Sequence, residues 1–238
     1  DRAYSAIANA NVIISRIDME NEVGEDNKKV IKGQALFFRA YFYNFLANLY
    51  GGVPLILEEA TEPRKDYVRA TREATYDQAR QDLEDAIKML NDITKAKDGG
   101  VNIQAAQHLL AEVYISLGDY SKAIAAATAV ITHPSMGLMK TRFGSRKDET
   151  GDPYWDLFQL NNQNRSSGNT ETIWALQYEY KNSGSSYSNE MPRWLLPYYE
   201  GLNVRDKEDK KNVKAFTLNT MEKGGRGIGT IRPTNHFL

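Results

Sequence analysis

The feature that most limits what this chain can fold into is residues 33–55, "GQALFFRAYFYNFLANLYGGVPL". Drawn as an α-helix, the stretch carries aromatic and aliphatic side chains around most of its circumference. A helix that is apolar on two faces is buried between other helices. Gly51 and Gly52 suit a left-handed C-cap, and Pro54 prevents the helix from continuing. We therefore predict the middle helix of a helical stack. One of its apolar faces carries Ala35, Phe38, Phe42, Phe45 and Leu49, and the other carries Phe37, Ala40, Tyr41 and Ala47.

Residues 1–135 follow a helical pattern, with apolar residues spaced three and four apart. Thr71 and Asn102 are predicted N-caps of two helices, and Gly118 is predicted to end the second of them. The helices on either side of Gly118 place their packing residues where a tetratricopeptide repeat of about 34 residues requires them. We predict a mainly α fold with a tetratricopeptide-like helical repeat scaffold over residues 1–135. The matching positions are Leu110, Ala111, Tyr114, Gly118, Tyr120, Ala123 and Val130, with Tyr114 filling the gap between the two helices.

The pattern changes after residue 135. Asn, Gly and Ser cluster in residues 161–169 and 181–189, which are predicted loops. Between them, residues 171–180, "ETIWALQYEY", are rich in β-forming residues and are predicted to form a strand. All three tryptophans fall in this half of the chain. Loops mounted on a helical platform commonly carry binding residues. We therefore predict that residues 136–238 form a loop-rich, partly β, ligand-binding region of the same domain.

Composition and motifs give no support to catalysis, metal binding or nucleic-acid binding. The chain has 30 basic and 31 acidic residues, a balance without the basic footprint of a nucleic-acid-binding protein. It has no cysteine, no metal spacing among its three histidines, no P-loop and no nucleophile elbow. Asp82, Glu84 and Asp85 are interpreted as a solvated helix face rather than as paired catalytic carboxylates. The sequence contains no run of about eighteen apolar residues, so no membrane span is predicted. We expect no enzymatic activity and no cofactor.

The residues with binding chemistry are aromatic and lie in residues 185–201, "SSYSNEMPRWLLPYYEG". Tyr and Trp rings stack on the apolar C–H faces of sugar rings, while amide, guanidinium and phenol groups can bond the sugar hydroxyls. The alternative is that these aromatic residues pack the loops onto the helices, because aromatic side chains dominate burial. For Trp174, within the predicted strand, we favour packing. The candidate ligand-binding residues are Tyr187, Asn189, Arg193, Trp194 and Tyr198.

Six segments, taken in order, resemble the SusD/RagB family of surface lipoproteins from nutrient-import systems of Gram-negative bacteria. The segment with the strongest likeness is residues 32–55, in which a "G-x-A-x-F-x-R-A" pattern leads to a glycine and then to "V-P-L". Residues 105–131 resemble the tetratricopeptide helix pair of the family. The resemblance covers nearly the whole chain. The six segments are residues 4–17, 32–55, 68–90, 105–131, 171–180 and 227–238.

The resemblance implies binding without catalysis. Such proteins lie at the cell surface on the outer membrane, bind an oligosaccharide and deliver it to a SusC-like TonB-dependent transporter. It points first to Tyr187 as a sugar-stacking residue. Since family members carry a lipid-bearing N-terminal cysteine and further C-terminal helices, we expect the chain to be an internal fragment, with membrane association only through a lipid anchor that it lacks. Two alternatives stay open, which are the peptide-binding component of a RagB-type importer and a tetratricopeptide protein-interaction scaffold.

Overall fold

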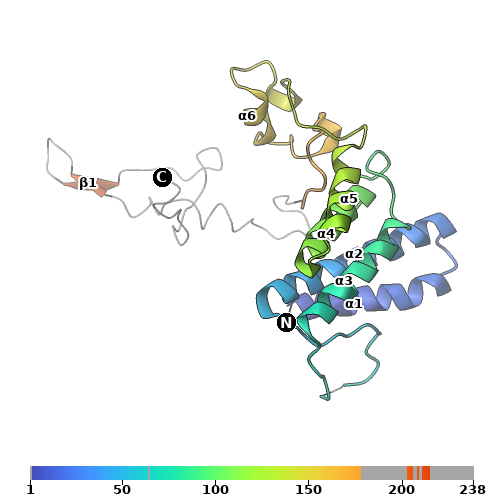
Figure 1. Cartoon of the computed structure of the whole chain (residues 1–238). Helices are drawn as coiled ribbons and strands as arrows, with labels where there is room; N and C mark the ends of the chain where they lie inside the picture. Colours follow the sequence, from blue (N-terminus) through green and yellow to red (C-terminus); the bar gives the residue numbers. More distant parts are fainter. Residues whose placement is uncertain (1, 64, 178–202, 206–207, 209–210, 215–238) are drawn as a thin grey trace. The chain divides into compact units, whose positions relative to one another are not determined.

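Helices make up most of the described part of the chain in this computed structural model, which describes residues 2–63, 65–177, 203–205, 208 and 211–214 (Figure 1). The chain divides into two compact units, residues 1–175 and 176–238. The helices among the described residues lie in the first unit, and the predicted mainly α fold is confirmed. The α-helices are α1 (Arg2–Arg16), α2 (Glu25–Tyr50), α3 (Arg72–Ile87), α4 (Ile103–Leu117), α5 (Tyr120–Ile131) and α6 (Pro153–Leu157), and the 3₁₀ helices are η1 (Ile17–Met19), η2 (Gly144–Arg146) and η3 (Arg165–Ser167).

The second unit contains a two-stranded antiparallel sheet among its described residues. It pairs β1 (Asn203–Arg205) with β2 (Asn212–Lys214). This agrees with the predicted partly β character of the second region. The helical unit itself extends through residue 175, and the ligand-binding role assigned to residues 136–238 stays a prediction.

The helix α2 is the middle layer that its sequence predicts. It packs against both α1 and α3, and α4 and α5 continue the stack (Figure 1). Phe37 is 2% exposed and Tyr43 is fully buried. Phe45 and Leu49, on the other predicted apolar face, are exposed instead, so that face is only partly covered. Among the described residues, even this long helix lacks the apolar content needed to cross a membrane, and so do the others.

Two glycines at the end of α2 serve different purposes. Gly51 ends α2 with a φ of 72°, a value that residues with a Cβ rarely adopt. Its ψ of −137° lies outside the left-handed helical region, so the predicted left-handed C-cap was wrong, although the position does require glycine. At Gly52 a Cβ would lie 1.9 Å from the carbonyl oxygen of Ala70. The chain before α3 therefore passes directly over Gly52. This close approach is held by Arg69, whose guanidinium donates hydrogen bonds to the carbonyls of Tyr50 and Gly52.

The predicted caps of α3 and α4 are confirmed. The Thr71 hydroxyl accepts a hydrogen bond from the Ala74 N–H at 3.1 Å, and the Asn102 side-chain oxygen accepts one from the Ala105 N–H at 2.9 Å. These bonds satisfy amide donors that the first turn of a helix leaves without a partner. Gly118 ends α4 in the left-handed conformation, with a φ of 79°.

A buried polar cluster joins the first three helices. The Arg39 guanidinium on α2 makes a two-pronged ion pair with Asp82 on α3, with N–O distances of 2.7 and 2.6 Å. Its Nη1 also donates to the Asn11 side chain of α1 at 2.9 Å and to the Leu57 carbonyl at 3.0 Å. The two charged side chains are only 7% and 4% exposed. Each buried charge therefore depends on its partner, because an unpaired charge away from water is costly.

The prediction that Asp82 lies on a solvated face was wrong. Asp82 comes three residues after Ala79 and directly before Leu83, which are both fully buried, so it shares their side of α3. Helical periodicity alone predicts that residue 82 is buried. A carboxylate can be buried there because Arg39 pairs with it. Asp85 is exposed, as predicted, and forms a surface ion pair with Lys88.

Tyr114 connects three helices, more than the two that its sequence position predicts. It is buried on α4, and its hydroxyl donates to Glu84 on α3 at 2.6 Å. Burial, together with this bond, raises the pKa of Tyr114 to about 12. From α5, the Lys122 ammonium lies 5.5 Å from the ring centre. As the last helix of the stack, α5 contributes Ala123 and Val130 to the buried residues.

Candidate functional site

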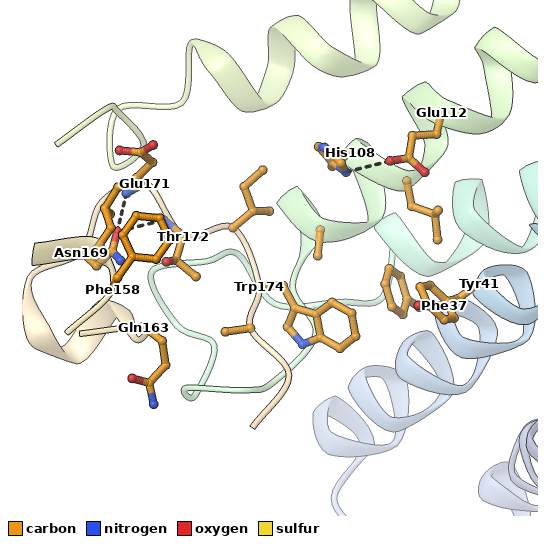
Figure 2. Close-up of a pocket in the computed structure, with 15 residues that line it drawn as sticks. Phe37, Tyr41, His108, Glu112, Phe158, Gln163, Asn169, Glu171, Thr172 and Trp174 are labelled. Atoms are coloured by element: carbon orange, nitrogen blue, oxygen red, sulfur yellow. Dashed lines mark hydrogen bonds and ion pairs between the residues drawn. The ribbon is translucent and has the colours of Figure 1, made fainter. Parts of the chain in front are cut away.

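A groove in the helical unit brings together side chains from distant parts of the chain. Its cavity has a volume of about 660 Å³ and lies between α2, α4 and the segment 157–175 (Figure 2). Figure 2 shows aromatic rings on one side of the cavity and mostly polar side chains across from them. The lining residues are Phe37, Tyr41, Ala105, His108, Leu109, Glu112, Leu157, Phe158, Gln163, Asn169, Glu171, Thr172, Ile173, Trp174 and Ala175.

Trp174 is the centre of the aromatic side. Its ring meets Phe37 and Phe38 edge-on, with ring centres 5.5 and 6.0 Å apart. Phe37 in turn stacks against Tyr41. The indole N–H of Trp174 donates to the Gly99 carbonyl at 3.0 Å, which satisfies its polar atom. The packing role favoured for Trp174 is confirmed, and the same ring forms part of the groove wall.

Residues 171–177, the described part of the predicted strand 171–180, form no strand. The prediction was wrong over this range because the backbone bonds to side chains rather than to a neighbouring strand. The Ile173 carbonyl accepts a hydrogen bond from the side-chain amide of Asn102 at 2.9 Å. Asn102 thus caps α4 and also fixes the segment that carries Trp174 beside that helix.

Asn169 organises the polar side of the groove. It is 2% exposed, and its side-chain oxygen accepts hydrogen bonds from the N–H groups of Glu171 and Thr172, at 2.9 and 3.0 Å. Its amide group donates to the Asn162 carbonyl at 2.9 Å. The Glu171 carboxylate accepts a bond from the Met139 N–H at 3.0 Å. The turn that presents Glu171 and Thr172 to the cavity is therefore held from both ends.

The charges at the groove are few and mainly acidic. His108 and Glu112 are exposed and lie one turn apart on α4, with the imidazole Nδ1 3.8 Å from the carboxylate (Figure 2). Glu171 is the other carboxylate among the lining residues, and none of the fifteen is Lys or Arg. Among the residues that the structure describes, no group of three or more His, Asp or Glu side chains is arranged to hold a metal ion. The groove can offer stacking surfaces and hydrogen bonds.

A buried ion pair fixes α6, which ends beside the groove. The Arg142 guanidinium donates to both oxygens of Asp156, at 2.6 and 3.0 Å, and the Phe143 N–H donates to the same carboxylate at 3.0 Å. The side chain of Asp156 is completely buried. Hydrogen bonds from Arg142 lower the pKa of Asp156 below its ordinary value. At the start of α6, Asp152 caps the helix by accepting a bond from the Trp155 N–H.

Two aromatic side chains of this region remain exposed. Tyr154 and Phe158 are 69% and 71% exposed, and their rings meet at 68° with centres 5.1 Å apart. Phe158 lines the groove, and Figure 2 shows it across the cavity from Trp174.

The five candidate residues from sequence lie outside the described residues. Their contacts therefore stay predictions, and the groove consists of other side chains. The groove was not predicted from the sequence because its residues come from segments more than a hundred positions apart, such as Tyr41 and Phe158. The signal that was present is the aromatic cluster in residues 154–158, next to the Asn-rich loop 161–169. The five candidates are Tyr187, Asn189, Arg193, Trp194 and Tyr198.

Residues 1–115 match a SusD-like family model described as starch-binding and associating with the outer membrane. SusD-like protein P2 of Formosa agariphila is 29% identical over 193 residues, which are 79% of this chain and 35% of that protein.

Solved structures resemble the fold. A SusD-like carbohydrate-binding protein of Bacteroides fragilis superposes with a TM-score of 0.66 at 18% identity, over 82% of this chain and 34% of that one. A laminarin-binding SusD-like protein superposes with a TM-score of 0.54 at 26% identity, over 68% of this chain and 35% of that one. The chain therefore spans about a third of the length of these relatives.

Proposed function

We propose that this chain, a member of the SusD/RagB family, binds an oligosaccharide at the surface of the outer membrane and delivers it to a SusC-like TonB-dependent transporter without catalysing a reaction. The family model describes starch binding in association with the outer membrane. A relative that is 26% identical over 68% of this chain binds laminarin, a glycan. Both findings support an oligosaccharide as the ligand.

The observation that carries the proposal is the aromatic groove. A sugar ring has apolar C–H faces and a polar rim, and the groove offers the rings of Tyr41 and Trp174 on one side with Gln163 and Thr172 among its polar groups. Its volume of about 660 Å³ is within the usual range of small-molecule sites. The peptide alternative would rely on backbone pairing and fewer ring stacks, so the aromatic wall favours a sugar.

Changing Tyr41 to alanine is expected to weaken glycan binding about tenfold, or roughly 1.4 kcal/mol, because the groove loses a stacking surface. Affinity electrophoresis in gels containing laminarin, starch, xylan or mannan measures the change. Tyr120→Ala is the matched control, since Tyr120 is an exposed tyrosine on α5 and is not part of the groove. Thermal melts of both variants check that they fold. Equal retention of the two variants would exclude the groove, and a wild-type chain that no glycan retards would refute oligosaccharide binding.

The loop residues predicted from sequence give a separate expectation. Sugar stacking on Tyr187 and Trp194, with hydrogen bonds from Asn189, Arg193 and Tyr198, is proposed as a second contact region. Tyr187→Ala and Trp194→Ala should each reduce retention in the same gels. If both variants migrate like the wild type, these loops are not the binding site, and this conclusion does not depend on the result for Tyr41→Ala.

A further inference from the structure

We propose that Tyr154 and Phe158 form an outer subsite that continues the groove, so that the ligand is a sugar chain long enough to reach from Trp174 to α6. The inference rests on the proposed function, because it extends the same binding site. It adds both a pair of contact residues and a requirement on ligand length.

Phe158 provides the continuity between the groove and the pair. It lines the cavity, while its ring also contacts Tyr154, which lies outside the lining residues. Across the cavity, Trp174 and Tyr41 form the opposite wall (Figure 2). Trp174 and the pair of Tyr154 and Phe158 thus offer two separate stacking surfaces. A chain of several sugars can place one ring near Trp174 and another over Tyr154.

The backbone that carries the exposed pair is anchored, although α6 is too short to be stable alone. An isolated helix of five residues does not form in water. Here Pro153 occupies the first turn, Asp152 caps it, and the buried Asp156 carboxylate is bonded by Arg142. The same guanidinium donates to three backbone carbonyls of residues 146–151 and lies 5.5 Å from the Trp155 ring centre.

This anchoring has a consequence for binding. A backbone that is already anchored loses little conformational freedom when a ligand stacks on the rings it carries, so more of the contact energy appears as affinity. Both rings are largely exposed and their planes meet at 68°, so the pair offers apolar ring surface to solvent. Such a surface suits the C–H face of a sugar, which needs a flat apolar contact and leaves its hydroxyls in water.

Isothermal titration calorimetry with disaccharides and hexasaccharides of the laminari, malto, xylo and manno series tests the subsite. The wild-type chain should bind a hexasaccharide more tightly than the disaccharide of the same series. Tyr154→Ala should bind the disaccharide like the wild type and the hexasaccharide about fivefold to tenfold more weakly. Phe158→Ala should weaken both, because Phe158 also lines the groove. Tyr120→Ala serves as the matched control.

The possible outcomes distinguish a failure of the outer subsite from a failure of the proposed function. If Tyr154→Ala and Tyr120→Ala bind the hexasaccharide equally well, the outer subsite is refuted and oligosaccharide binding stands. If affinity does not rise with chain length, the length requirement is refuted in the same way. If the wild-type chain binds no member of any series, both the proposed function and the subsite fall. Circular dichroism confirms the fold of each variant, and Tyr154 is exposed, so its replacement removes little packing.

Discussion

Replacing Arg39 with alanine is expected to lower the free energy of unfolding by about 3–5 kcal/mol, because it leaves the Asp82 carboxylate buried without its charged partner. The carboxylate is 4% exposed and receives both of its ion-pair bonds from Arg39. The change also removes the bonds to Asn11 and to the Leu57 carbonyl. Urea denaturation followed by circular dichroism measures the loss.

A surface pair provides the control for this expectation. Lys88 and Asp85 are 70% and 54% exposed, and their ion pair is worth less than about 1 kcal/mol. Lys88→Ala should therefore shift the urea midpoint only slightly. If Arg39→Ala is no more destabilising than Lys88→Ala, the buried cluster does not hold α1, α2 and α3 together.

Replacing Gly52 with alanine should destabilise the chain by about 3 kcal/mol, at the upper end of the range for overpacked sites. The new Cβ would lie 1.9 Å from the Ala70 oxygen and 2.6 Å from the Thr71 carbonyl carbon, and backbone atoms cannot rotate away. Relief of the clash requires residues 70–71 to move, which strains the hydrogen bond from the Ala70 N–H to the Val53 carbonyl and displaces the cap of α3. Thermal and urea unfolding report the change.

Gly137 supplies the matched control for Gly52. A Cβ at Gly137 meets no heavy atom within 4 Å, and its φ is not in the left-handed range. Gly137→Ala should therefore change stability by less than about 0.5 kcal/mol. Equal effects of the two substitutions would mean that the close approach at Gly52 is not what requires glycine there.

The elements that could be predicted from the sequence are those determined by residues close together in the chain. Repeated apolar spacing and the caps at Thr71, Asn102 and Gly118 predicted the helices, and these features depend on residues within one or two turns. The buried position of Asp82 was missed because the residue that neutralises it, Arg39, is 43 positions away. A charged residue in a helix is normally solvated, and only the packing of α2 on α3 reverses that expectation.

The site was harder to predict for the same physical reason. Trp174 was expected to pack, but its partner Phe37 is distant in sequence, so the groove between them has no local signature. Residues 171–177 have the composition of a strand, yet the Asn102 amide bonds the Ile173 carbonyl and holds the segment against α4. The ligand-binding residues predicted at 187–198 remain predictions, because they lie outside the described part of the chain.

The helices of the stack differ in how much of their apolar surface is buried. At its centre, α2 contributes Phe37 and Tyr43 to the core along with the Arg39 charge, whereas α5 buries Ala123 and Val130 and leaves Ile131 75% exposed. Opening α5 from the end of the stack separates it from one helix, α4, while opening α2 separates it from both α1 and α3 and requires a buried ion pair to be broken. Local unfolding should be graded along the chain, with α5 separating in small fluctuations and α2 only when the whole helical unit unfolds.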